Sequence, residues 1–129
     1  MSEEQEQEST STSSSTDPSR EQDTRTKIFI VDDHPAIREA LTSAINSKID
    51  TRVVGESGTA KKALRQMDRH EPDVVVVDIS LEDAHGLDLV EEIRSRFPEV
   101  RIVVYSMYEE SVYAERAIRA GASGYVMKS

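Results

Sequence analysis

The sequence lacks cysteine and tryptophan, and four tyrosines and two phenylalanines are the remaining large aromatic residues. A chain without cysteine forms no disulfide, no thiolate metal site and no thiol nucleophile. No segment approaches the roughly 18 consecutive apolar residues of a membrane span. The N-terminus carries acidic residues where a signal peptide has basic and then apolar ones. These absences predict a soluble cytoplasmic protein.

Basic runs are absent as well. The chain has 16 basic and 25 acidic side chains, which gives a net charge of −9 with histidine neutral. A DNA-binding domain usually carries a basic patch, so this balance argues against DNA binding by the chain itself. The charge is uneven: residues 1–26 hold two arginines and seven acids, or −5, and the other residues hold 14 basic and 18 acidic side chains, or −4.

The first 26 residues differ from the rest in composition. They contain twelve Ser or Thr residues and a single apolar residue, Met1. Such a segment buries too little apolar area to offset the entropy of ordering it, so 1–26 is predicted to be a disordered acidic tail. A solvated leader is favoured over a tract regulated by phosphorylation. One folded domain is expected over 27–129.

Residues 27–129 alternate between two apolar periods, one typical of strands and one typical of helices. The expected strands are 27–31, 51–56, 73–78, 101–106 and 123–127, and the expected helices are 34–48, 58–70, 86–97 and 109–120. This order predicts an α/β fold, a doubly wound parallel sheet with helices on both faces. Such sheets bind ligands beyond the carboxyl ends of their strands.

Candidate site residues stand at four of the five expected carboxyl ends, and the remaining end, Glu56-Ser57-Gly58, is typical of a turn and helix start. Asp32 and Asp33 follow the first strand, and Asp78 ends the third. Ser106 ends the fourth strand and Lys128 the fifth. Crowded carboxylates repel one another, and a divalent cation relieves the repulsion. Oxygen ligands without cysteine favour Mg²⁺, and a carboxylate beside a metal and a lysine can accept a phosphoryl group.

Each of these residues also has an ordinary structural reading. Asp32 and Asp33 can cap the helix that follows, and Asp78 can be a turn residue. Ser106 can begin a helix, and Lys128 can be a solvated strand end. The functional interpretation depends on their occurrence together, each at a strand end.

The sequence resembles the receiver domain of two-component response regulators, a CheY-like family, and within it the NarL/FixJ subfamily. The matching stretches are IFIVDDHPAIREAL, PDVVVVDISLEDAHGLDLV, RIVVYSMYEE and AIRAGASGYVMKS. The resemblance covers about residues 27–129. It implies a flavodoxin-like, five-stranded sheet of strand order 2-1-3-4-5.

By this resemblance Asp78 is the phospho-acceptor. Asp33, Asp78 and the backbone carbonyl of Ser80 are the Mg²⁺ ligands, and Asp32 shapes the acidic pocket. Lys128 pairs with the phosphoryl group. Ser106 is the switch hydroxyl and Tyr125 the switch aromatic residue.

The sequence departs from the family in three places. Glu82 stands where the family often has proline, and Met107 where the family has a small residue. A fifth helix normally follows the fifth strand, and the chain ends without one. Its absence would expose an apolar strip of the sheet, and we expect a fragment of a longer regulator rather than a strip covered by a partner. Relatives carry a C-terminal DNA-binding domain, so DNA contact is expected only through an output domain outside this chain.

The expected function is that of a phosphorylation-controlled switch, not an enzyme with a separate substrate. Its partner would be a sensor histidine kinase or a phosphotransfer protein, and the resemblance allows a homodimer; no membrane partner is expected. A phosphorylation-independent interaction module is the alternative on the same fold. A phosphatase of the haloacid dehalogenase type is disfavoured, because it needs a second acid where Ser80 stands. A flavin or dinucleotide carrier is disfavoured as well, because no Gly-rich loop follows the first strand.

Overall fold

The computed structural model describes residues 23–79, 81, 85–106 and 111–127. Within these ranges, strands and helices alternate through nine elements. The strands are β2 (Thr26–Val31), β3 (Thr51–Ser57), β4 (Val74–Asp78), β5 (Arg101–Ser106) and β6 (Gly124–Met127). The helices are α2 (Pro35–Asn46), α3 (Ala60–His70), α4 (Gly86–Arg96) and α5 (Ser111–Ala120). Every element expected from the sequence is present, with described ends that differ by at most two residues.

The described strands form one five-stranded sheet in the order β3-β2-β4-β5-β6. Every neighbouring pair is parallel. Counted along the chain, this order is 2-1-3-4-5, so the predicted doubly wound, flavodoxin-like topology is confirmed. The four valines of β4 occupy the middle of the sheet, where strands are covered on both faces.

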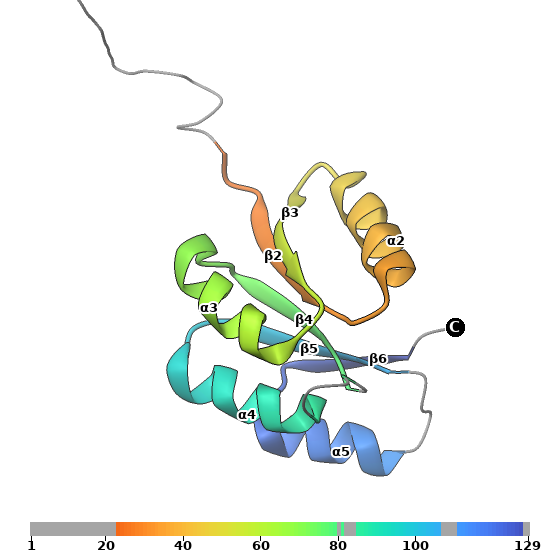
Figure 1. Cartoon of the computed structure of the whole chain (residues 1–129), viewed down its shortest axis with the longest axis vertical. Helices are drawn as coiled ribbons and strands as arrows, with labels where there is room; N and C mark the ends of the chain where they lie inside the picture. Colours follow the sequence, from red (N-terminus) through yellow and green to blue (C-terminus); the bar gives the residue numbers. More distant parts are fainter. Residues whose placement is uncertain (1–22, 80, 82–84, 107–110, 128–129) are drawn as a thin grey trace, which may run out of the picture.

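The helices divide unequally between the two faces of the sheet. Figure 1 shows α2 on one face and α3, α4 and α5 on the other. No helix in the described ranges is long and apolar enough to cross a membrane.

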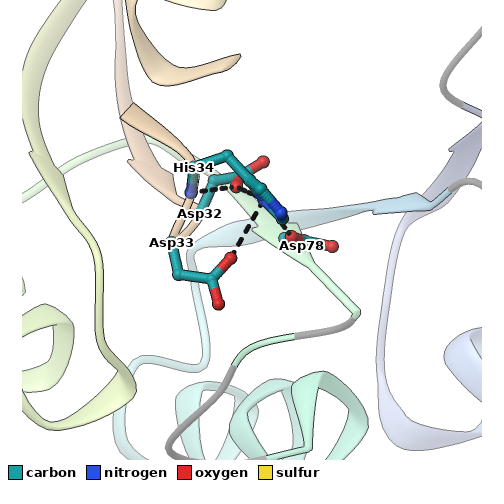
Figure 2. Close-up of side chains that lie close together, drawn as sticks. All are labelled: Asp32, Asp33, His34 and Asp78. Carbon is teal, nitrogen blue, oxygen red and sulfur yellow. Dashed lines mark hydrogen bonds and ion pairs between the residues drawn. The ribbon is translucent and has the colours of Figure 1, made fainter. Parts of the chain in front are cut away.

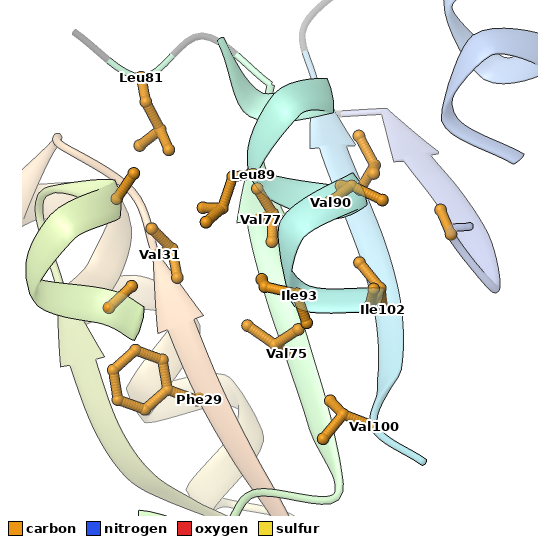
Figure 3. Close-up of a cluster of buried hydrophobic side chains, with 14 of the residues drawn as sticks. Phe29, Val31, Val75, Val77, Leu81, Leu89, Val90, Ile93, Val100 and Ile102 are labelled. Atoms are coloured by element: carbon orange, nitrogen blue, oxygen red, sulfur yellow. The ribbon is translucent and has the colours of Figure 1, made fainter. Parts of the chain in front are cut away.

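The main hydrophobic core lies between the sheet and the three helices α3, α4 and α5 (Figure 3). Alternate residues of β2, β4 and β5 point into it, as the period of a strand requires. Its strand residues include Phe29, Val75, Val77, Ile102 and Val104. The helices contribute Met67, Leu89, Val90, Ile93 and Ala117. Burial of each valine, leucine, isoleucine, phenylalanine or methionine in this core stabilises the fold by about 1.5–3 kcal/mol.

The face of the sheet that carries α2 is less completely covered. No residue of α2, all of which the structure describes, is buried. In β5, Val103 and Tyr105 point toward this face and are half-buried, whereas Ile102 and Val104 on the opposite face are fully buried. Val126 of β6 is 48% exposed. These residues form a partly exposed apolar strip on this face of the sheet.

Ion pairs fasten the chain just before β2 to the neighbouring strand. Arg25 Nε donates to Asp23 Oδ1 over 2.9 Å, and Arg52 Nε of β3 lies 3.2 Å from Asp23 Oδ2. The side-chain hydrogen bond from Arg25 lowers the pKa of Asp23 to about 2. These contacts lie at the edge of the sheet opposite the carboxyl ends of the strands.

Arg94 of α4 holds the end of α5 in place. Gly121 follows the last residue of α5 with φ of 117°, a left-handed conformation that favours glycine after the end of a helix. Arg94 Nη2 donates to the Gly121 carbonyl over 2.9 Å, and Arg94 Nη1 donates to the Pro98 carbonyl over 2.6 Å. One side chain thus ties α4 to two loops.

Arg94→Ala is expected to lower the free energy of unfolding by about 1–3 kcal/mol, because it removes charge-assisted hydrogen bonds to two carbonyl groups. Arg119→Ala is the control, since Arg119 is exposed and forms a 3.4 Å ion pair with the exposed Glu115 of the same helix. Its loss should cost at most about 0.5 kcal/mol. Urea denaturation followed by circular dichroism measures both, and equal losses would contradict the anchoring role of Arg94.

Candidate functional site

The register of two parallel strands brings acidic side chains together at the carboxyl edge of the sheet. Val31 of β2 lies beside Val77 of β4. The next residues, Asp32 and Asp78, therefore meet side by side. They are only 1% and 2% exposed. Burial of two neighbouring carboxylates is costly, so their position calls for a compensating partner such as a cation.

Asp33 and His34 complete a four-residue cluster with these two carboxylates (Figure 2). One potential ligand atom from each side chain lies within 4.8 Å of the others. His34 Nδ1 is 2.8 Å from Asp32 Oδ1 and 3.0 Å from Asp33 Oδ1. It also lies 3.6 Å from Asp78 Oδ2. The imidazole therefore faces all three carboxylates.

The donor atoms of this cluster suit a divalent cation. Three carboxylates supply hard oxygen ligands, and the chain has no cysteine to supply sulfur. Asp33 Oδ1 is buried and accepts no hydrogen bond from the described residues. It can therefore direct a lone pair at a cation without losing a hydrogen bond. The residues fit the metal site expected from the sequence.

The loop between β2 and α2 is held by its own hydrogen bonds. The His34 backbone N–H donates to Asp32 Oδ1 over 2.8 Å, an Asx-type turn. His34 is the N-cap of α2, and Pro35 follows it at the first helical position, where no N–H is needed. The positive end of the α2 dipole thus points toward the carboxylates and stabilises negative charge there.

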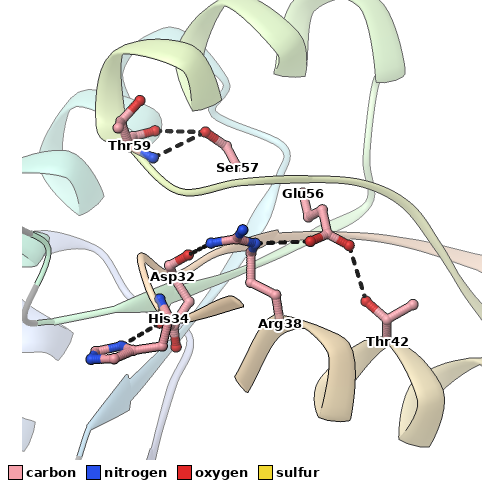
Figure 4. A network of polar contacts seen from close by, with 7 residues as sticks. All are labelled: Asp32, His34, Arg38, Thr42, Glu56, Ser57 and Thr59. Carbon is pink, nitrogen blue, oxygen red and sulfur yellow. Dashed lines mark hydrogen bonds and ion pairs between the residues drawn. The ribbon is translucent and has the colours of Figure 1, made fainter. Parts of the chain in front are cut away.

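A second network ties this loop to the end of β3 (Figure 4). The Asp32 N–H donates to the Ser57 carbonyl over 3.0 Å. Arg38 of α2 donates through Nη1 to the Asp32 carbonyl over 2.5 Å and through Nε to Glu56 Oε1 over 2.8 Å. Thr42 also donates to Glu56, over 3.4 Å. The backbone that carries Asp32 is fixed from two elements.

The chain just after Asp78 packs closely against the start of α4. The Ile79 N–H donates to the Tyr105 carbonyl over 3.1 Å, and the Gly86 N–H donates to the Ile79 carbonyl over 3.0 Å. A Cβ on Gly86 would lie 2.5 Å from Ile79 Cα and 2.7 Å from the Asp78 carbonyl oxygen. Only glycine permits this approach, which positions the backbone that carries Asp78.

The structure places two of the remaining predicted residues on neighbouring strands. Ser106 ends β5, is fully buried, and follows Tyr105, which pairs with Asp78. Tyr125 of β6 pairs with Val104 and is partly buried against the core. It therefore lies farther from the carboxyl edge than Ser106. The predicted sites at Ser80 and Lys128, and the departures at Glu82 and Met107, lie outside the described residues.

His34 belongs to the cluster although the sequence analysis did not select it. A signal was present, because histidine is a common metal ligand and here it follows two acidic residues directly. Its sequence position alone does not decide whether the ring turns toward the carboxylates or toward solvent.

Nearly all of the folded region matches one protein family. The family model, described as the response regulator receiver domain, matches residues 28–129. The chain belongs to the response regulator receiver family. The resemblance inferred from the sequence motifs is thereby confirmed.

The receiver is similar to transcription regulators of the NarL and LuxR type. It is 37% identical over 102 residues to the DNA-binding transcriptional activator DevR/DosR of Mycobacterium tuberculosis, which covers 79% of this chain and 47% of the activator. A LuxR-family two-component response regulator from Aurantimonas sp. SI85-9A1 is 37% identical, with a TM-score of 0.78 over 81% of this chain and 75% of that one.

The signal receiver domain of NarL from Mycobacterium tuberculosis is 27% identical to this receiver, with a TM-score of 0.75 over 80% of this chain and 83% of that one. The receiver spans about half the length of the curated relatives it matches.

Gly86→Ala is expected to destabilise the receiver by about 1–3 kcal/mol, because the added methyl overlaps backbone atoms that cannot move independently. Gly124→Ala is the control, since nothing lies within 4 Å of a Cβ there. That change should stay within about 0.5 kcal/mol. Thermal or urea unfolding compares the two variants, and equal stabilities would show that α4 can shift away from β4 without cost.

Proposed function

We propose that this receiver is a phosphorylation-controlled switch whose phosphoryl acceptor is Asp78. The observation that carries the proposal is the position of Asp78, buried at the carboxyl end of the middle strand and clustered with two further carboxylates. The family supplies the reaction class, and the cluster supplies the chemistry that this class requires.

The donor is a phosphohistidine of a sensor histidine kinase or of a phosphotransfer protein. A carboxylate oxygen of Asp78 attacks the phosphorus in line. The P–O bond forms as the P–N bond breaks, and the donor's imidazole nitrogen keeps the bonding electron pair. The backbone contacts around Ile79 and Gly86 hold Asp78 in position for this attack.

Asp33, Asp78 and the backbone carbonyl of Ser80 are the residues that would hold Mg²⁺. When bound, Mg²⁺ neutralises negative charge on the phosphoryl oxygens. Asp32, fixed by Ser57 and Arg38, shapes the acidic pocket from the other side.

Ser106, Lys128 and Tyr125 respond to the phosphoryl group in this proposal. Lys128 pairs with it, the Ser106 hydroxyl donates a hydrogen bond to it, and Tyr125 rotates into the space that Ser106 leaves. The burial of Ser106 at the adjacent strand end and the partial burial of Tyr125 support these roles. The result is a shift between two conformations of the surface formed by α5 and β6.

In this proposal a partner protein binds this surface in one of its two conformations. Ile118 of α5 is 52% exposed, and Val126 and Met127 of β6 are 48% and 42% exposed. Exposed large apolar residues on adjacent elements are typical of interaction surfaces, and a second copy of the receiver is one such partner. The regulated output in this proposal is transcription, through a DNA-binding domain outside this chain, because one relative is a DNA-binding transcriptional activator and the matched residues cover 47% of it.

Incubation of the receiver with a small phosphodonor and Mg²⁺ should give a single phosphoryl adduct by intact-mass measurement. The adduct should require Mg²⁺ and disappear in Asp78→Asn, because the amide is a poor nucleophile. Asp68→Asn is the matched control, since Asp68 is an exposed residue in the last turn of α3, the helix that leads to the start of β4.

Three results would contradict the proposal. An adduct that persists in Asp78→Asn would place the acceptor elsewhere. No adduct under any condition would favour the phosphorylation-independent interaction module. Hydrolysis of the donor over many turnovers would favour a phosphatase.

A further inference from the structure

His34 is the one member of the acidic cluster whose role the proposed phosphotransfer does not explain. Its ring nitrogen Nδ1 lies within 3.6 Å of an oxygen of each of the three carboxylates. The ring is otherwise accessible, with 58% of its side chain exposed. It therefore presents one nitrogen to the pocket and leaves the other side toward solvent.

The distances from this nitrogen match those between ligands of one metal ion. Ligand atoms about 2.1 Å from an ion lie about 3.0 Å apart at adjacent octahedral positions and about 3.4 Å apart at tetrahedral ones. Nδ1 of His34 is 2.8, 3.0 and 3.6 Å from the three carboxylate oxygens. Small movements of the side chains are enough to place a single ion within reach of all four.

The backbone of His34 is prepared for this position. Its N–H donates to Asp32 Oδ1, and its carbonyl accepts hydrogen bonds from Ile37 and Arg38 at 3.1 and 3.0 Å. The ring is also held by the 2.8 Å hydrogen bond between Nδ1 and Asp32 Oδ1. A metal bound through Nδ1 replaces this hydrogen bond and needs little further ordering of the side chain.

Ligand chemistry then indicates which class of metal gains from the histidine. Mg²⁺ prefers oxygen ligands and keeps several waters, so a nearby imidazole contributes little to its binding. First-row transition metals bind imidazole nitrogen readily. We propose that His34 Nδ1 is a ligand for a divalent transition metal at the phosphoryl-acceptor site, and that it gives the receiver a preference for such ions over Mg²⁺ that the carboxylates alone do not provide. The inference rests on the proposed function insofar as both use the metal site at Asp78.

Co²⁺ is a suitable probe, because its visible absorption reports both binding and a change of ligand. The full chain and three variants are titrated with Co²⁺ alone and with Mg²⁺ alone by calorimetry, at one fixed pH. His34→Ala and His34→Gln should weaken Co²⁺ binding tenfold or more and shift its visible bands. Loss of a residue that only supports a metal ligand already costs roughly tenfold to 100-fold in affinity. Mg²⁺ affinity should change by less than about twofold, since Mg²⁺ gains little from a nitrogen ligand.

His70→Ala is the matched control, because His70 is the last residue of α3, near Phe29 and distant from the carboxyl edge. It should bind both ions as the unaltered receiver does. Circular dichroism verifies that each variant is folded, and His34→Gln keeps a polar side chain at the N-cap should the alanine variant unfold.

Two results would overturn the inference. Equal weakening of Co²⁺ and Mg²⁺ in the His34 variants would make His34 a general support of the pocket. Tighter binding of either ion would show that the ring occupies the metal position and competes with the metal. In both cases a Mg²⁺-dependent adduct on Asp78 would leave the proposed function intact, so the two failures are distinguishable.

Discussion

The parallel pairing of β2 with β4 is the constraint on which the site depends. Its register sets Asp32 beside Asp78 at the end of two buried strands. Two like charges about 4 Å apart repel by roughly 4 kcal/mol at an effective dielectric constant of about 20. A shift of one residue would turn the alternate apolar side chains to the wrong face, so the core fixes the register despite this repulsion.

Several weaker interactions offset the repulsion without removing the pocket. The N-terminus of α2 points at the carboxylates, and Asp32 accepts a backbone hydrogen bond from the loop. Arg38 donates hydrogen bonds to the Asp32 carbonyl and to the Glu56 carboxylate, which is not part of the cluster. Arg38 therefore fixes the backbone that carries Asp32 without pairing with the clustered carboxylates.

Much of the fold and part of the site were predictable because they depend on local patterns. The valine run of β4, the glycine after α5 and the acids after β2 each specify structure within a few residues. The ring direction of His34 and the link from Arg94 to Gly121 were not predictable, since each depends on how distant or neighbouring elements pack. The exposure of α2 was not predictable either, since apolar periodicity indicates which side of a helix is apolar and not what covers that side.

The exposure of α2 has a consequence for the dynamics of the receiver. A helix without a buried residue is held mainly by its hydrogen bonds and by partial contacts, so it opens at a lower free energy than the elements around the main core. The loop that carries Asp33 and His34 enters this helix directly. A metal held by this loop and by Asp78 would therefore connect a helix that has no buried residue to the middle strand of the sheet. Metal occupancy would then be thermodynamically linked to amide hydrogen exchange in α2, and slower exchange there would report the occupied site.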